Sequence, residues 1–273
     1  MLPGLNPSGV PAELAGTVHT FCYNQLDEFD SAIEACGKDL AAIVMEPTRS
    51  ADPKPGFLET IRQRANKLGV PLIFDEISAG WRYCVGGSHL MFNVQPDIAV
   101  FAKAISNGFP MAAVIGRSEV MSACHESFIS STYWTEGIGP AAALATIRKL
   151  QQKDVPAHLQ AIGSRVMNGW KALAAKHKLD VAVGGRPASC SLSFNHPQNA
   201  ELLTLMTTRM LDDGFLAAGS CSLTFAHQQH HVASYLQALD NVFVELSEAI
   251  QRDDVESRLK GPVKHSTFRR LTE

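Results

Sequence analysis

Three short apolar runs, each leading into a charged residue, constrain the fold more than any other feature of this chain. The runs are Ala41–Met45, Leu72–Phe74 and Ile98–Phe101, and the charged residues that follow them are Glu46, Asp75 and Lys103. An apolar run bounded by turn signals is typical of a strand buried on both faces of a parallel sheet. Because ligands bind where such strands end, the charged residues indicate a site.

Strand and helix patterns alternate through the first half of the chain. Val18–Tyr23 and Ala112–Ile115 predict further strands, and Leu26–Gly37 and Gly56–Leu68 predict amphipathic helices. This alternation predicts a largely parallel sheet, and the turn signal at Asn107-Gly108 predicts one antiparallel member. The fold class is therefore α/β.

The second half of the chain is richer in long helices. Helices are predicted over Gly139–Gln152, Val155–Lys178, Ala200–Asp212 and His227–Ile250, with a strand at Cys190–Phe194. We predict a partial large domain over residues 1–151, a smaller α+β domain over 152–257 and a charged tail over 258–273.

Composition favours a small-molecule partner. The 273 residues carry a net charge of -3, which provides no basic surface for nucleic acid. No apolar run approaches the roughly 20 residues that span a membrane, and no secretory signal opens the sequence, so we expect a cytoplasmic protein. The six cysteines show no CxxC spacing, which predicts reduced, mostly buried thiols rather than a zinc site or a disulfide framework.

Lys103 and Asp75 are the residues most able to carry chemistry. A lysine at the end of a buried strand loses hydration, which favours the neutral, nucleophilic amine that forms a Schiff base. An aspartate on a neighbouring strand end can pair with the protonated ring nitrogen of pyridoxal phosphate. Gly80 would let the backbone pass close to a planar ligand. The alternative is that these residues are ordinary solvated strand-end charges.

Three other motifs allow a functional and a plainer interpretation. His227 and His231 have a spacing able to bind metal, but a polar helix start explains them better. Gly86-Gly87-Ser88-His89 is either a ligand loop or, as we favour, a surface turn. The basic stretch Lys260–Arg270 is either an anion contact or, as we favour, a solvated tail.

Three segments together resemble the class III (subgroup II) pyridoxal-phosphate aminotransferases. They are AAIVMEP, PKPGFLETIRQRANKLGVPLIFDEISAGWR and QPDIAVFAKAISNGFPMAAVIG, and within the family they look most like glutamate-1-semialdehyde 2,1-aminomutase. The resemblance covers most of the chain from about Gly9 to Ala249. It implies an incomplete large domain of fold type I, a smaller C-terminal domain and pyridoxal 5'-phosphate as cofactor.

The resemblance also implies roles for individual residues. Lys103 would be the Schiff-base lysine, Asp75 the partner of the pyridine nitrogen, and Ile77 a packing surface for one face of the ring. Glu46 falls where the family has a carboxylate on the substrate side of the site. A family threonine contacts the phosphate of the neighbouring subunit's cofactor, which implies a dimer; Thr135 matches it best, with Thr132 as second choice.

One part of the family pattern finds no match. Family members carry, before the equivalent of Met1, a domain-sized segment with a phosphate-binding turn and an aromatic residue that stacks on the ring. We therefore expect the C-terminal portion of an aminotransferase, with weak or absent cofactor binding by the isolated chain. The first hypothesis is amino-group transfer between small molecules, with Lys103 as covalent anchor and proton carrier. The alternative is a catalytically inactive fragment or truncated paralogue that keeps a dimerisation surface and pairs with itself or a full-length homologue.

Overall fold

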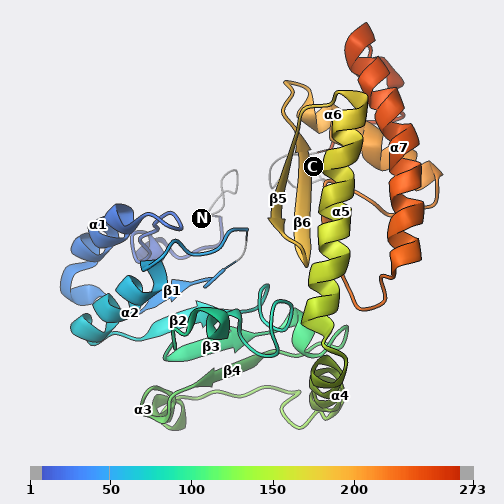
Figure 1. Ribbon diagram of the computed structural model, residues 1–273. Coiled ribbons are helices and arrows are strands. Elements are labelled where there is room, and N and C mark those ends of the chain that lie inside the picture. Colours follow the sequence, from blue (N-terminus) through green and yellow to red (C-terminus); the bar gives the residue numbers. More distant parts are fainter. Residues whose placement is uncertain (1–7, 49, 265–273) are drawn as a thin grey trace. The chain divides into compact units, whose positions relative to one another are not determined.

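The computed structural model describes residues 8–48 and 50–264 (Figure 1). The chain divides into two units, one over Gly16–His158 and one that takes the described residues from Leu159 onward with those up to Ala15. The domain bounds predicted from the sequence stay a prediction. Residues 265–270 of the basic stretch, and most of the predicted tail, lie outside the described residues.

The first unit is organised around a four-stranded sheet in the order β1-β2-β3-β4. β1, β2 and β3 pair in parallel and β4 pairs antiparallel to β3, as the alternation and the Asn107-Gly108 turn predict. The apolar runs therefore form neighbouring strands of one sheet. The strand bounds are β1 (Ile43–Met45), β2 (Leu72–Asp75), β3 (Ile98–Phe101) and β4 (Ala113–Gly116).

Helices α1 (Leu26–Cys36) and α2 (Phe57–Leu68) supply the core beside β1 and β2 (Figure 1). Apolar residues at helical spacing put one face of α2 inward, and Gly69 ends the helix in the left-handed conformation. The shared core cluster lets the helices hold the strands in place. Its most buried members are Phe29, Phe57, Leu58, Ile61, Leu72 and Phe74.

Two expectations about the strands are wrong. The parallel strands are not buried on both faces, since Val44 of β1 is 59% exposed and the alternate residues of β2 and β3 are half-buried. Val18–Tyr23 forms no strand. The Phe21 ring packs edge-on against Phe29, and the Cys22 N–H donates to the Glu28 carboxylate, so this segment is held by α1.

Short helices and α4 complete the first unit. α4 begins close to Gly139 as predicted and contributes Ala143 to a second cluster with Ala99, Phe101 and Ile105. The elements are η2 (Gly37–Asp39), η3 (Ser88–Phe92), η4 (Lys103–Ile105), α3 (Ser118–Met121), η5 (Ser122–His125) and α4 (Ile138–Lys153).

The second unit contains an antiparallel sheet in the order β5-β6-β7. The helices lie close to their predicted positions, but β5 was not predicted because its sequence, VAVGGR, contains two adjacent glycines. The elements are η1 (Ala12–Leu14), α5 (Val155–His177), β5 (Val181–Arg186), β6 (Ser189–Phe194), α6 (Asn199–Asp212), β7 (Ser220–Ser222), α7 (Gln229–Arg252) and η6 (Glu256–Arg258).

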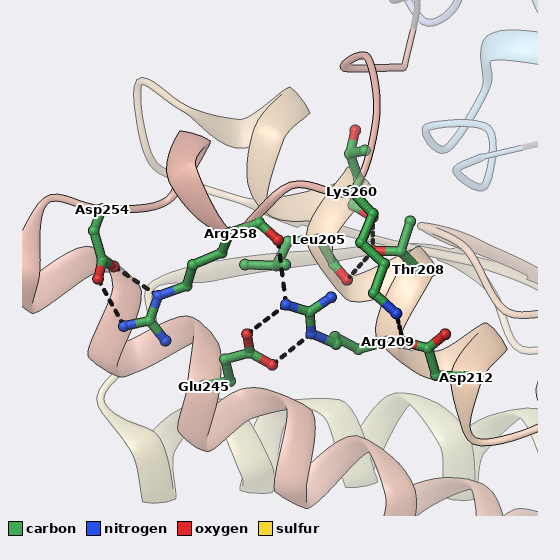
Figure 2. A network of polar contacts seen from close by, with 9 residues as sticks. Leu205, Thr208, Arg209, Asp212, Glu245, Asp254, Arg258 and Lys260 are labelled. Atoms are coloured by element: carbon green, nitrogen blue, oxygen red, sulfur yellow. Dashed lines mark hydrogen bonds and ion pairs between the residues drawn. The ribbon is translucent and has the colours of Figure 1, made fainter.

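Ion pairs join α6, α7 and the segment after α7 (Figure 2). Arg209 of α6 donates from Nε and one terminal nitrogen to both oxygens of Glu245 of α7, at 2.8 and 2.9 Å. The same terminal nitrogen donates to the carbonyl of Arg258, whose own guanidinium makes a two-pronged contact with Asp254. Such two-pronged pairs fix geometry as well as add energy, so they hold the end of α7 against α6.

The predicted polar start of α7 is present. His231 Nδ1 accepts a hydrogen bond from the Gln228 N–H at 3.0 Å, and His227 Nδ1 accepts one from the Thr224 N–H at 3.0 Å. The His231 imidazole caps the start of α7, and the His227 imidazole caps the turn that precedes it, which agrees with the plainer interpretation. None of the helices in the described ranges is long and apolar enough to cross a membrane.

Candidate functional site

The carboxyl ends of the parallel strands meet at one edge of the first unit's sheet. Met45 is in register with Phe74, and Asp75 is in register with Val100 of β3. Glu46 therefore follows the end of β1 next to Asp75, and Lys103 follows the end of β3. The strand order thus delivers two carboxylates and a lysine to the same edge.

Lys103 adopts an unusual backbone conformation at this edge. Its φ is 49°, in the left-handed region that residues with a side chain rarely occupy. Its Nζ donates a hydrogen bond to Ser78 Oγ at 2.7 Å. The side chain is exposed rather than desolvated as the sequence suggested, so its amine is accessible to a ligand. Strain of this kind, at a residue held by a specific contact, is a reason to suspect function.

Asp75 is the last residue of β2 and is half-buried. Its Oδ1 accepts a hydrogen bond from the Ile77 N–H at 2.9 Å, which fixes the orientation of the carboxylate. Ser78 lies one residue further and contacts Lys103, so a single short loop ties the two predicted catalytic residues together. Ser78 was not predicted from the sequence; its position three residues after Asp75 was the available signal.

Glu76 is fully buried and is satisfied by the loop that follows β2. Ser88 Oγ donates to Oε2 at 2.8 Å, and the His89 N–H donates to Oε1 at 2.9 Å. The His89 ring nitrogen Nδ1 also contacts Oε1 at 2.8 Å. The favoured interpretation of Gly86-Gly87-Ser88-His89 as a surface turn is therefore wrong, because its last three residues are buried over this carboxylate.

Glycines allow this close packing around Glu76. A Cβ on Gly80 would lie 2.8 Å from the Glu76 carbonyl oxygen and 2.8 Å from the Phe101 ring. A Cβ on Gly87 would lie 2.3 Å from the His89 ring. The close neighbour of Gly80 in the structure is thus the Phe101 ring, where the sequence suggested a planar ligand. The two glycines let the loop after β2 fold down on the strand ends.

The remaining predicted residues lie on other elements. Glu46 is half-buried directly after β1, beside the Asp75 strand. Thr135 and Thr132 are both exposed in the turn before α4. In that turn the Glu136 carboxylate accepts hydrogen bonds from the N–H groups of Ile138 and Gly139, so it occupies the start of α4. The roles predicted for Glu46, Thr135 and Ile77 stay predictions.

The donor set suits an aldehyde cofactor with a basic ring nitrogen. Lys103 offers an accessible amine, and Asp75 offers a carboxylate whose orientation is fixed by the backbone. Pyridoxal phosphate requires an amine as covalent anchor and an acidic partner for its ring nitrogen, so these two residue types fit that cofactor. Within the described ranges, no group of three or more His, Cys, Asp or Glu side chains is arranged to hold a metal ion.

Known proteins share this arrangement of strands. A 3-aminobutyryl-CoA aminotransferase from Cloacimonas acidaminovorans (strain Evry) is 38% identical over 151 residues, which are 53% of this chain and 36% of that protein. The FumI protein of Sphingopyxis sp. MTA144, described as its PLP internal aldimine form, superposes with a TM-score of 0.80 at 23% identity. An omega-transaminase from Sphaerobacter thermophilus superposes with a TM-score of 0.77 at 22% identity.

The matches cover much of this chain but only part of the other proteins. The two structures align with 85% and 88% of this chain, which correspond to 58% and 60% of their own chains. This chain therefore spans about a third of the curated relative and somewhat over half of each solved structure. The family model for aminotransferase class-III matches residues 9–243. The chain therefore belongs to the class-III aminotransferase family.

Proposed function

We propose that this chain carries the lysine-bearing part of an enzyme that transfers amino groups between small molecules with pyridoxal 5'-phosphate. The observation that carries the proposal is the geometry of Lys103. Its backbone is held in the left-handed region at the end of β3, and its Nζ is bonded to Ser78 on the loop after Asp75. Family membership supports the same chemistry.

Lys103 is assigned two tasks in this reaction. Its amine attaches the cofactor covalently, and after release from that bond it carries a proton to and from the substrate carbon. When bound, pyridoxal phosphate supplies the electron sink that makes this proton removable. Ser78 Oγ accepts a hydrogen bond from Lys103 Nζ at 2.7 Å and so holds the amine in position between these tasks.

Asp75 is assigned the role of contacting the protonated ring nitrogen of the cofactor. The Ile77 N–H occupies Oδ1, and the carboxylate keeps further acceptor capacity for a protonated nitrogen. A negative charge held there favours the protonated ring. Ile77 supplies apolar surface to one face of the ring, and Glu46 lies on the substrate side. These two roles rest on the resemblance of the surrounding motifs.

Two finer features, the subtype of the reaction and the oligomeric state, are proposed from the resemblance. The resemblance of the Asp75 and Lys103 segments supports the aminomutase subtype, whereas the curated relative, 38% identical over 151 residues, is named an aminotransferase and supports ordinary amino-group transfer. Thr135 is proposed to contact the phosphate of a neighbouring subunit's cofactor, which requires a homodimer. Both proposals concern the activity and assembly of the whole protein.

Trapping of the cofactor tests the assignment of Lys103. The chain is incubated with excess pyridoxal phosphate and reduced with borohydride, which makes even weak attachment permanent, and the labelled lysines are located by peptide mass spectrometry. We expect labelling to concentrate at Lys103 in the folded chain. Lys67, exposed in the last turn of α2, is the matched control for unspecific reaction.

Substitutions of the two lysines provide a second readout, the absorption band of a Schiff base between lysine and pyridoxal phosphate. Lys103→Ala should lose this band, whereas Lys67→Ala should keep it. Asp75→Asn should keep labelling at Lys103 but require more cofactor, because the charge that favours the protonated ring is gone. Equal labelling of Lys103 and Lys67 in the folded chain would contradict the proposal.

A catalytically inactive fragment or truncated paralogue is the second candidate. The observation that favours it is that the Glu136 carboxylate accepts hydrogen bonds from the N–H groups of Ile138 and Gly139 at the start of α4, which uses donors that could otherwise contact a phosphate. This candidate predicts unspecific labelling of the isolated chain. It also predicts that a full-length family member, added in equal amount, co-elutes with this chain in size-exclusion chromatography.

A further inference from the structure

Two cysteines of the second unit face each other across neighbouring strands. Cys190 of β6 and Cys221 of β7 are in register in the antiparallel pair. The hydrogen bonds Leu192 N–H to Gly219 carbonyl and Leu223 N–H to Ala188 carbonyl lie on either side, two residues away. In such a pair the Cα atoms are about 5.5 Å apart. This falls within the about 4.4–6.8 Å that a disulfide spans.

The two thiols are not equivalent. Cys190 is buried and its Sγ approaches the Cys221 carbonyl at 3.8 Å, whereas Cys221 is half-buried. A second contact, the hydrogen bond from the Cys190 thiol to the Cys221 side chain, lowers the pKa of Cys221, although burial opposes this. The same hydrogen bond, together with burial, raises the pKa of Cys190. Cys221 is therefore the thiol that ionises first, and the thiolate is the reactive form.

Cys221 is also the thiol that a small molecule can reach. It lines a cavity of about 430 Å³ in the second unit, together with Ser220, Leu216, His227 and Tyr235. Cavities of roughly 300–1,000 Å³ accommodate small ligands. Cys190 is absent from the lining, so a reagent in this cavity meets Cys221 first.

We propose that Cys190 and Cys221 form a thiol–disulfide modification site that reacts with low-molecular-weight disulfides, with Cys221 as the attacking thiol and Cys190 as the resolving thiol. The Cys221 thiolate attacks one sulfur of the small disulfide, and the other sulfur leaves as a thiolate that takes up a proton. Cys190 then loses its proton and attacks Cys221 Sγ, which releases the second small thiol. The two cysteines are oxidised to a disulfide, and the small disulfide is reduced to two thiols.

The oxidised pair would join β6 to β7 behind the cavity wall. Excess small thiol reverses both exchanges, so the modification reports the ratio of small disulfide to thiol. The reaction needs no cofactor and takes place in the second unit, whereas Lys103 belongs to the first. It can therefore fail or succeed independently of the proposed amino-group transfer.

Peptide mapping detects the disulfide directly. The full chain is incubated with oxidised glutathione, quenched by acid, alkylated and digested with trypsin without reduction. Cys190 falls in the peptide 179–209, since Arg186 precedes a proline, and Cys221 falls in the peptide 210–252. We expect these peptides to appear joined, lighter than their sum by two hydrogen atoms, and to separate on addition of reduced glutathione.

Single variants assign the order of attack. Cys190→Ser should lose the joined peptides and accumulate a glutathione adduct at Cys221, whereas Cys221→Ser should leave Cys190 unmodified. Cys124→Ser, which removes an exposed cysteine of the first unit, should leave the joined peptides unchanged. Circular dichroism confirms that each variant is folded, and a variant that is not is replaced by the corresponding alanine variant.

Two results would overturn the proposal. One is a wild-type chain whose exposed Cys22 and Cys124 become glutathionylated while the joined peptides are absent. The other is a folded Cys221→Ser chain that accumulates the adduct at Cys190, because Cys190 would then be the attacking thiol. The wild-type experiment needs no variant, so it decides whether Cys190 and Cys221 form a disulfide even if a substitution perturbs folding.

Discussion

Asp97 is the residue whose replacement tests most directly how the sheet of the first unit is held. It precedes β3, and its buried carboxylate accepts hydrogen bonds from the Leu72 N–H at 2.8 Å and from Arg62 at 2.7 Å. Arg117, after β4, donates to the other oxygen at 3.0 Å. One carboxylate therefore joins the start of β2, α2 and the end of β4. The Asp97→Ala variant removes all of these contacts.

The size of the effect follows from the exposure of the partners. The Arg62 side chain is 17% exposed and that of Asp97 is 6% exposed, so removing one partner leaves a largely buried charge and costs ~3–5 kcal/mol. The Arg117 side chain is 60% exposed, so the loss of its ion pair with Asp97 costs only ~0–1 kcal/mol. Asp97→Asn keeps an acceptor for Leu72 but loses the charge, so we expect an intermediate loss of ~1.5–3 kcal/mol.

An exposed ion pair of the same unit provides the matched control. Asp30 and Arg64 are 44% and 45% exposed, with 3.2 Å between nitrogen and oxygen. Asp30→Ala should therefore cost less than about 1 kcal/mol. The free energy of unfolding is measured at neutral pH by urea titration, and hydrogen exchange of the segment around Leu72 restricts the readout to this unit. If Asp97→Ala costs no more than Asp30→Ala, the reasoning is refuted.

The pH dependence of the same variants gives a second check. Burial raises the pKa of Asp97, but the hydrogen bonds from the Leu72 N–H and from Arg62 outweigh it, and the net pKa is lowered. A carboxyl with a lowered pKa in the folded state stabilises above the unfolded pKa of about 3.9 and loses this contribution as the pH falls through the folded value. The stability gap between the wild type and Asp97→Asn should therefore narrow below about pH 4.

Two further predictions concern the second unit. A Cβ on Gly163 would lie 1.9 Å from the carbonyl oxygen of Pro187, whereas a Cβ on Gly169 would meet only the end of a leucine side chain. Gly163→Ala should therefore lower the melting temperature more than Gly169→Ala does. We expect Gly163→Ala to destabilise the chain by ~1–3 kcal/mol or above. Burial raises the pKa of Tyr235, so stability should be lost as the pH rises above about 10. Tyr235→Phe should abolish that loss in urea titrations but cost ~1–3 kcal/mol, because the indole N–H of Trp170 loses its acceptor at 2.8 Å.

The sequence predicted best those elements whose pattern is local and unambiguous. Ile98–Phe101 matches β3 residue for residue, and the antiparallel β4 follows from the turn at Asn107-Gly108. Val18–Tyr23 has the composition of a strand, but composition does not say whether a partner strand is present. The opposite error occurred at Val181–Arg186, where adjacent glycines conceal a strand that pairs along its whole length with β6.

The candidate site was predictable only in outline. Strand order alone places Asp75 and Lys103 at the same edge, because the carboxyl ends of parallel strands meet there. The exposure of Lys103 and its contact with Ser78 were not predictable, since both depend on a left-handed backbone conformation at a lysine. Lysine has no preference for the left-handed conformation, so the sequence does not predict it there. The packed loops on either side of Lys103 impose it.

The neighbouring acids Asp75 and Glu76 show how one residue step separates an accessible carboxylate from an enclosed one. Successive side chains at a strand end point to opposite sides, so the two carboxylates enter different surroundings. Glu76 is enclosed by Ser88 and His89, which use its acceptor capacity inside the protein. Asp75 has one oxygen fixed by a backbone N–H and stays half-exposed, which leaves it able to receive a ligand's proton-bearing nitrogen. The loop that covers Glu76 therefore leaves Asp75 as the carboxylate of the pair that a ligand can reach.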